Sequence, residues 1–138
     1  MPVPSDRVPP PSRSPFKGKT GIARIVQALF NSLAGLADAW RHESAFRQEV
    51  ALAAVLLPVA LWLDVSVAER CLLVLTVLFV LVVELLNSGV EAAIDRISFD
   101  RHDLSKRAKD FGSAAVLVAL AMLVFVWGTV LWNARSVL

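Results

Sequence analysis

Apolar residues recur at helical spacing along residues 20–41. The steps of three and four residues place them on one side of a helix: Ile22, Ile25, Val26, Leu29, Leu33, Leu36 and Trp40. Polar residues lie mostly off that side. An amphipathic helix that leads into apolar segments is typical of the membrane interface. The pattern therefore predicts a surface helix over 20–41, with a helix packed on a soluble core as the alternative.

Three longer apolar segments follow, at 45–63, 68–94 and 112–133. The last is the clearest, because 113–132 carries no charge over the length that spans a bilayer. The first is the weakest, since Arg47 and Glu49 lie near its start and Pro58 interrupts it. A membrane helix tolerates both features. We therefore predict an all-α membrane protein with one surface helix and three transmembrane helices.

Composition agrees with this prediction. Hydrophobic residues make up 57% of the 138 positions and charged residues only 19%. These values exclude a disordered chain or a collagen-like fibre, and the single cysteine, Cys71, excludes an internal disulfide. A soluble domain of this size could hardly bury so much apolar surface. Residues 1–19 hold six of the seven prolines and are expected to form a disordered arm before the membrane domain at 20–138.

The distribution of Lys and Arg predicts an orientation. Seven lie in residues 1–49 and five in the loop expected at 95–110, against one at 64–70 and one in the tail. Cytoplasmic segments carry the excess of positive charge. The N-terminus and the 95–110 loop are therefore expected in the cytoplasm.

Four polar residues line one face of the second apolar segment, where it meets that loop. At 100° per residue, Asn87, Glu91 and Asp95 fall at about −60°, −20° and +20° from Glu84. We call Glu84, Asn87, Glu91 and Asp95 the acidic stripe. Such a stripe on an apolar helix is costly unless it is paired, protonated or bound to a metal. It favours a hard divalent cation with oxygen ligands; salt bridges to Arg24, Arg47 or Lys109 are the alternative.

Four segments together resemble the bacterial integral-membrane diacylglycerol kinase family. They are Ala45-Phe46-Arg47-Gln48-Glu49, Trp62-Leu63-Asp64-Val65, the stripe segment Glu84–Arg96, and Arg107-Ala108-Lys109-Asp110-x-Gly112-Ser113-Ala114-Ala115-Val116. The resemblance covers about residues 20–133. It implies a homotrimeric bundle in the bacterial inner membrane, with active sites shared between subunits at the cytoplasmic interface. The implied reaction transfers the γ-phosphate of ATP to diacylglycerol with Mg²⁺, and no nucleic acid is involved.

The resemblance also implies residue roles. Glu84 would be the general base, oriented by Asn87, and its depth in the apolar segment favours a base. Glu43 and Glu91 would hold Mg²⁺. The implied ATP-binding residues are Arg24, Asn31, Glu43, Glu91, Asp100, Arg101, His102, Lys109 and Asp110. The implied lipid-side residues are Arg24, Ser32, Trp40, Phe46, Arg47, Gln48, Glu49, Trp62, Leu63, Asp64, Val65, Arg70, Glu84, Ser113, Trp127 and Trp132.

Two other functions stay open at this point. A relative that phosphorylates undecaprenol would use the same base and metal, because only the lipid tail differs. A membrane path for protons or cations would instead need polar residues along a whole span. Here Cys71–Val83 offers only Thr76, so the pattern favours the kinase.

Overall fold

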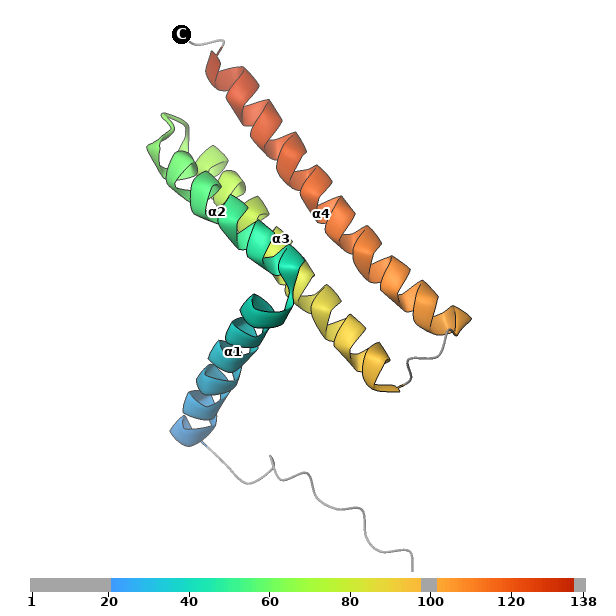
Figure 1. Ribbon diagram of the computed structural model, residues 1–138. Coiled ribbons are helices and arrows are strands. Elements are labelled where there is room, and N and C mark those ends of the chain that lie inside the picture. Colours follow the sequence, from blue (N-terminus) through green and yellow to red (C-terminus); the bar gives the residue numbers. More distant parts are fainter. Residues whose placement is uncertain (1–20, 98–101, 136–138) are drawn as a thin grey trace, which may run out of the picture. The chain divides into compact units, whose positions relative to one another are not determined.

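The computed structural model describes residues 21–97 and 102–135, except for the side chain of Arg135. This part of the chain forms four α-helices and no strand: α1 (Ile22–His42), α2 (Ser44–Trp62), α3 (Val67–Ile97) and α4 (Asp103–Arg135) (Figure 1). The predicted all-α class is confirmed. The described residues divide between Gly35 and Leu36 into two compact units. The predicted arm at 1–19 lies outside the described residues.

Helix α1 begins directly after Gly21, whose φ of 66° lies in the left-handed region that favours glycine. The Arg24 amide donates to the Gly21 carbonyl over 3.1 Å and closes the first turn. The apolar side chains that predicted this helix are exposed; Ile22, Ile25 and Leu29 range from 59% to 80%. An exposed apolar face of this kind fits a helix that lies at a membrane surface.

In the second unit, α3 packs along both α2 and α4. The core consists of one side of each helix: Ala53, Ala60, Leu73, Val77, Val80, Ala119, Leu123, Trp127 and Val130. Alanines on α2 and α4 allow close approach of the helices. Trp127 adds a hydrogen bond between helices, since its Nε1 donates to the Leu73 carbonyl over 3.3 Å. Many large apolar side chains still face outward.

Each of α2, α3 and α4 is long and apolar enough to cross a membrane, over Ser44–Trp62, Val67–Ile97 and Asp103–Ala134. The outward apolar side chains fit this assignment, because lipid is as apolar as a protein core. The described structure is therefore that of a membrane protein with three candidate spans. The homotrimer stays a prediction.

The connection expected at 95–110 is shorter than predicted. Helix α3 continues to Ile97 and α4 begins at Asp103, so charged residues assigned to a loop lie on helices. Local bonds explain the early start of α4: the Leu104 amide donates to His102 Nδ1 over 3.2 Å, and Lys106 pairs with Asp110 over 2.8 Å. The sequence reading erred because it took charge density as a sign of irregular structure.

The α2–α3 turn is fixed by side chains. Ser66 and Glu69 form a capping box: the Ser66 amide donates to the Glu69 carboxylate over 2.9 Å, and the Glu69 amide donates to Ser66 Oγ over 3.3 Å. Arg70 Nη2 donates to the Leu63 carbonyl over 2.9 Å. These bonds start α3 at Val67 and hold it against the end of α2.

We expect Ser66→Ala to lower the free energy of unfolding by about 1 kcal/mol, the usual cost of losing an N-cap. Reversible unfolding in mixed detergent micelles measures this. Ser44→Ala is the matched control, because Ser44 is exposed at the first residue of α2, and we expect no loss from it. Equal losses in the two variants would contradict the capping role.

Candidate active site

The acidic stripe lies on α3, and its side chains become more exposed toward the helix C-terminus. Glu84 is 3% exposed, Asn87 and Glu91 are half-buried, and Asp95 is 44% exposed. Asn87 Nδ2 donates to Glu91 Oε1 over 3.3 Å. The structure thus brings these residues together on one face, as the helical period predicted. Glu84 is also the deepest of the four.

Two further glutamates join Glu84 from α2 and its N-terminal end. The Glu84 carboxylate lies within electrostatic range of Glu91 and Glu43, and Glu49 lies within range of Glu84. Glu49 Oε2 is buried and has no hydrogen-bond partner within the described chain. Like charges this close raise the cost of the folded state unless protons or cations offset them. The cluster therefore has the chemistry of a cation site.

The donor set suits Mg²⁺ better than softer metals. Mg²⁺ prefers oxygen ligands and is usually held by one or two carboxylates together with waters and substrate phosphates. Within residues 21–97 and 102–135, no three His, Cys, Asp or Glu side chains form a metal-binding group by themselves. The carboxylates of Glu43 and Glu91 both interact electrostatically with Glu84. Two carboxylates suit a Mg²⁺ ion whose other ligands include phosphate oxygens.

Lys109 crosses from α4 to the stripe. Its Nζ lies 2.5 Å from Asp95 Oδ1, and its charge also interacts with Glu91. Asp95 therefore forms one of the salt bridges considered as the alternative to a metal site. In the described residues Glu84 forms no such salt bridge, so the alternative does not account for its buried charge. Lys109 is the cation that the described structure places beside the stripe, where it can also neutralise an incoming phosphate. Asp110 pairs with Lys106 on the same helix.

Gly112 on α4 lies against Asn87. A Cβ at position 112 would clash with Asn87 Oδ1, which is buried and without a hydrogen-bond partner in the described chain. Sequence reasoning did not single out Gly112 as a site residue. The available signal was a glycine inside a helix, which is unfavourable by propensity and often marks close packing.

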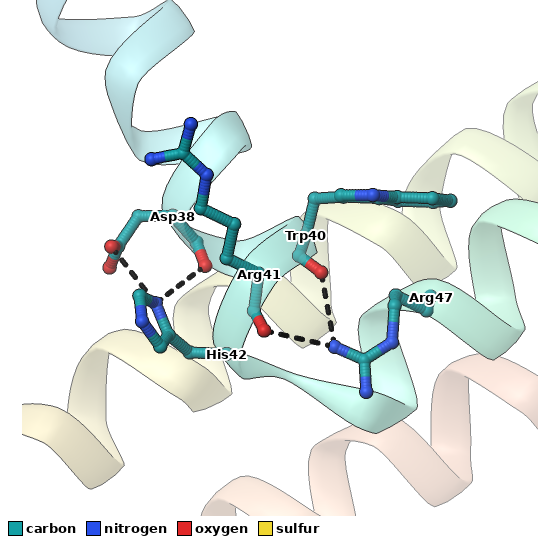
Figure 2. A network of polar contacts seen from close by, with 5 residues as sticks. All are labelled: Asp38, Trp40, Arg41, His42 and Arg47. Carbon is teal, nitrogen blue, oxygen red and sulfur yellow. Dashed lines mark hydrogen bonds and ion pairs between the residues drawn. The ribbon is translucent and has the colours of Figure 1, made fainter.

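Glu43 sits at the break between α1 and α2. Its φ of −100° and ψ of 112° are extended, and it is the residue between His42 and Ser44. Figure 2 shows the polar contacts around this break: His42 Nδ1 lies 3.0 Å from Asp38 Oδ1, and Arg47 contacts the carbonyls of Trp40 and Arg41. Glu43 is therefore held on a corner of the backbone rather than inside a helix.

The predicted lipid-side residues do not all gather at Glu84: Glu49 lies near it, but others are distant. A group of them lies at the α2–α3 turn: Trp62, Leu63, Asp64, Val65 and Arg70. The rise of a helix places Arg70 about 20 Å from Glu84 along α3. Phe46 and Trp127 are buried, with exposed fractions of 5% and 6%. Other predicted lipid-side residues are exposed: Trp40, Trp62, Trp132, Gln48 and Ser113. The residues of the turn could contact only a distant part of a lipid.

Some of the predicted nucleotide-binding residues lie in the first compact unit or outside the described residues. Arg24 and Asn31 belong to the first compact unit, where Gln27 Nε2 donates to Asn31 Oδ1 over 3.1 Å. The predicted lipid-side residue Ser32 belongs to the same unit. Asp100 and Arg101 lie outside the described residues. His102 is exposed and receives the Leu104 amide bond.

Comparison with known families decides the identity. The family model described as prokaryotic diacylglycerol kinase matches residues 30–131. The chain belongs to this family. The match spans the acidic stripe, Glu43, Lys109 and Gly112. The predicted family is therefore confirmed.

Named members of the diacylglycerol kinase family align over most of their length. The Pseudomonas aeruginosa diacylglycerol kinase is 56% identical over 120 residues, 87% of this chain and 98% of that protein. The Escherichia coli K12 diacylglycerol kinase is 47% identical, over 83% of this chain and 93% of its own. The Haemophilus influenzae diacylglycerol kinase is 44% identical, over 82% and 96%.

We expect Gly112→Ala to destabilise the protein by about 1–3 kcal/mol, the range for overpacking, because the new methyl group displaces Asn87. Gly128→Ala is the matched control on the same helix, since a Cβ there meets nothing within 4 Å. That variant should gain up to about 1 kcal/mol from helix propensity. Unfolding titrations of both variants measure the difference. Stabilisation by both substitutions would show that α3 and α4 are not in close contact at Asn87.

Proposed function

We propose that this chain is a diacylglycerol kinase that transfers the γ-phosphoryl group of ATP to the primary hydroxyl of diacylglycerol. The products are phosphatidic acid and ADP. The observation that carries the proposal is the buried Glu84 carboxylate with Glu43 and Glu91 in electrostatic range. Membership of the family supports the substrate class.

In the proposed reaction, Glu84 accepts the proton of the lipid hydroxyl. The hydroxyl oxygen forms a bond to the γ-phosphorus, while the bond from that phosphorus to the β–γ bridging oxygen breaks. ADP leaves with the electron pair of the broken bond. Glu84 is the least exposed residue of the acidic stripe, and positioning of the reacting groups supplies much of the catalysis of phosphoryl transfer.

The other residues of the stripe have supporting roles. Glu43 and Glu91 would hold Mg²⁺, which when bound offsets negative charge on the ATP phosphates. Asn87 donates to Glu91, so it would orient a metal-binding carboxylate as well as line the approach to Glu84. Lys109 would shift between Asp95 and the phosphates. Arg24, Asn31, Asp100, Arg101, His102 and Asp110 remain proposed nucleotide contacts.

We place the protein in the bacterial inner membrane as a multi-pass homotrimer, with the N-terminus and active site cytoplasmic. Three candidate spans support the membrane location. The excess of Lys and Arg in 1–49 and 95–110 supports the orientation. The trimer rests on the family resemblance.

A phosphorylation assay in mixed micelles tests the substrate. Diacylglycerol and undecaprenol are offered side by side with labelled ATP and Mg²⁺, and the lipid products are separated. We expect label in phosphatidic acid. Label in undecaprenyl phosphate alone would overturn the substrate proposal while leaving the kinase chemistry intact.

Glu84→Gln tests the base. We expect turnover to fall by about 10²- to 10⁴-fold, the typical contribution of general base catalysis. The thermal midpoint in detergent should stay equal or rise, because the substitution removes a buried negative charge. Glu69→Gln is the control at the other end of α3 and should keep its turnover. Near-normal turnover of Glu84→Gln would exclude Glu84 as the base.

A further inference from the structure

The break between α1 and α2 leaves backbone carbonyls in the last turn of α1 without helical donors. Helix α1 ends at His42, so the carbonyls of Trp40 and Arg41 lie in its last turn, where helical donors run out. Glu43 follows as the N-cap of α2 and makes no side-chain capping bond to that helix. Its carboxylate is therefore not engaged in capping α2.

Arg47 satisfies both carbonyls. Its Nη1 donates to the Trp40 carbonyl over 3.1 Å and to the Arg41 carbonyl over 3.2 Å (Figure 2). A cationic donor at a helix C-terminus also interacts favourably with the helix dipole. In addition, the Arg47 amide donates to the Glu43 carbonyl over 3.3 Å. The amide bond is an ordinary helical bond, whereas the side-chain bonds join Arg47 in the first turn of α2 to the last turn of α1, directly before Glu43.

We infer that Arg47 is a positioning residue, which fixes the backbone corner that presents Glu43 to Glu84 and Glu91. This inference rests on the proposed metal role of Glu43. It assigns Arg47 a task different from the lipid contact that the family resemblance implies. Within the described chain no ion pair joins Arg47 to a carboxylate, so its hydrogen bonds to the backbone carbonyls are the contacts that define its role.

Orientation of a metal ligand has a measurable effect. Loss of a group that orients a metal ligand typically weakens metal binding by 10- to 100-fold. A lipid contact would instead raise the KM for diacylglycerol and leave metal binding unchanged. The two roles of Arg47 therefore give different results in the same variant.

The test compares Arg47→Met, Glu43→Gln and the double variant as full-length protein in detergent. Binding of Mn²⁺, a stand-in for Mg²⁺, is followed by electron paramagnetic resonance with a non-hydrolysable ATP analogue. Kinetics give the half-saturating Mg²⁺ and the KM for diacylglycerol. Arg41→Met is the matched control: its side chain is exposed and points away from the two carbonyls in Figure 2. Arg47→Lys is included because a lysine can restore a cationic donor.

We expect Arg47→Met to weaken Mn²⁺ binding and raise the half-saturating Mg²⁺ by about tenfold, with the KM for diacylglycerol changed less than about twofold. Glu43→Gln should weaken Mn²⁺ binding as well. The double variant should be no weaker than Glu43→Gln alone, because Arg47 acts through Glu43. Arg47→Lys should recover part of the loss, and Arg41→Met should match the parent.

Two results would overturn the inference in distinguishable ways. If Glu43→Gln weakens Mn²⁺ binding but Arg47→Met only raises the KM for diacylglycerol, Arg47 is a lipid contact and the proposed metal site stands. If Glu43→Gln leaves Mn²⁺ binding unchanged, the metal role of Glu43 fails and the role of Arg47 fails with it. If Arg47→Met does not fold, the metal affinity of Arg47→Lys decides between the two roles.

Discussion

The main physical constraint on this structure is the burial of the Glu84 carboxylate beside other carboxylates. Glu84 is 3% exposed, and its charge interacts with Glu91, Glu43 and Glu49. Such an arrangement lowers the stability of the folded chain, because desolvation and repulsion act in the same direction. It also favours the binding of a positive charge beside these carboxylates. The same residues that limit stability therefore create the proposed binding site for MgATP.

The packing of α3 against α4 sets the shape of this site. Gly112 gives Asn87 the space to lie at the helix contact, and Lys109, one turn away on α4, reaches Asp95 and interacts with Glu91. The two helices run antiparallel, so their contacts pair residues that are distant in the sequence. A larger residue at 112 would move Asn87 and, through its bond to Glu91, one of the carboxylates proposed to hold the metal.

The sequence predicted those parts of the molecule that depend on local periodicity. The apolar pattern predicted α1 to α4, and the step of 100° per residue placed Glu84, Asn87, Glu91 and Asp95 on one face. It did not predict contacts between helices, such as Asp95 with Lys109 or Asn87 with Gly112, because a helical period carries no information on the register between two helices. The bonds from Arg47 to the carbonyls of Trp40 and Arg41 were not predicted for a similar reason, since every residue offers a backbone carbonyl.

The gradient of burial along α3 explains how one helix could serve two substrates of opposite character. Glu84 is buried among apolar residues of α3, which suits the proposed contact with a lipid hydroxyl. Glu91 and Asp95 lie two and three turns further along, where exposure increases toward the charged start of α4. This more exposed end suits the proposed binding of a hydrated metal and a nucleotide. Because the acidic residues recur at helical spacing, the depth of each carboxylate follows from its position along α3, and the γ-phosphoryl group would meet the lipid hydroxyl between the two ends of the stripe.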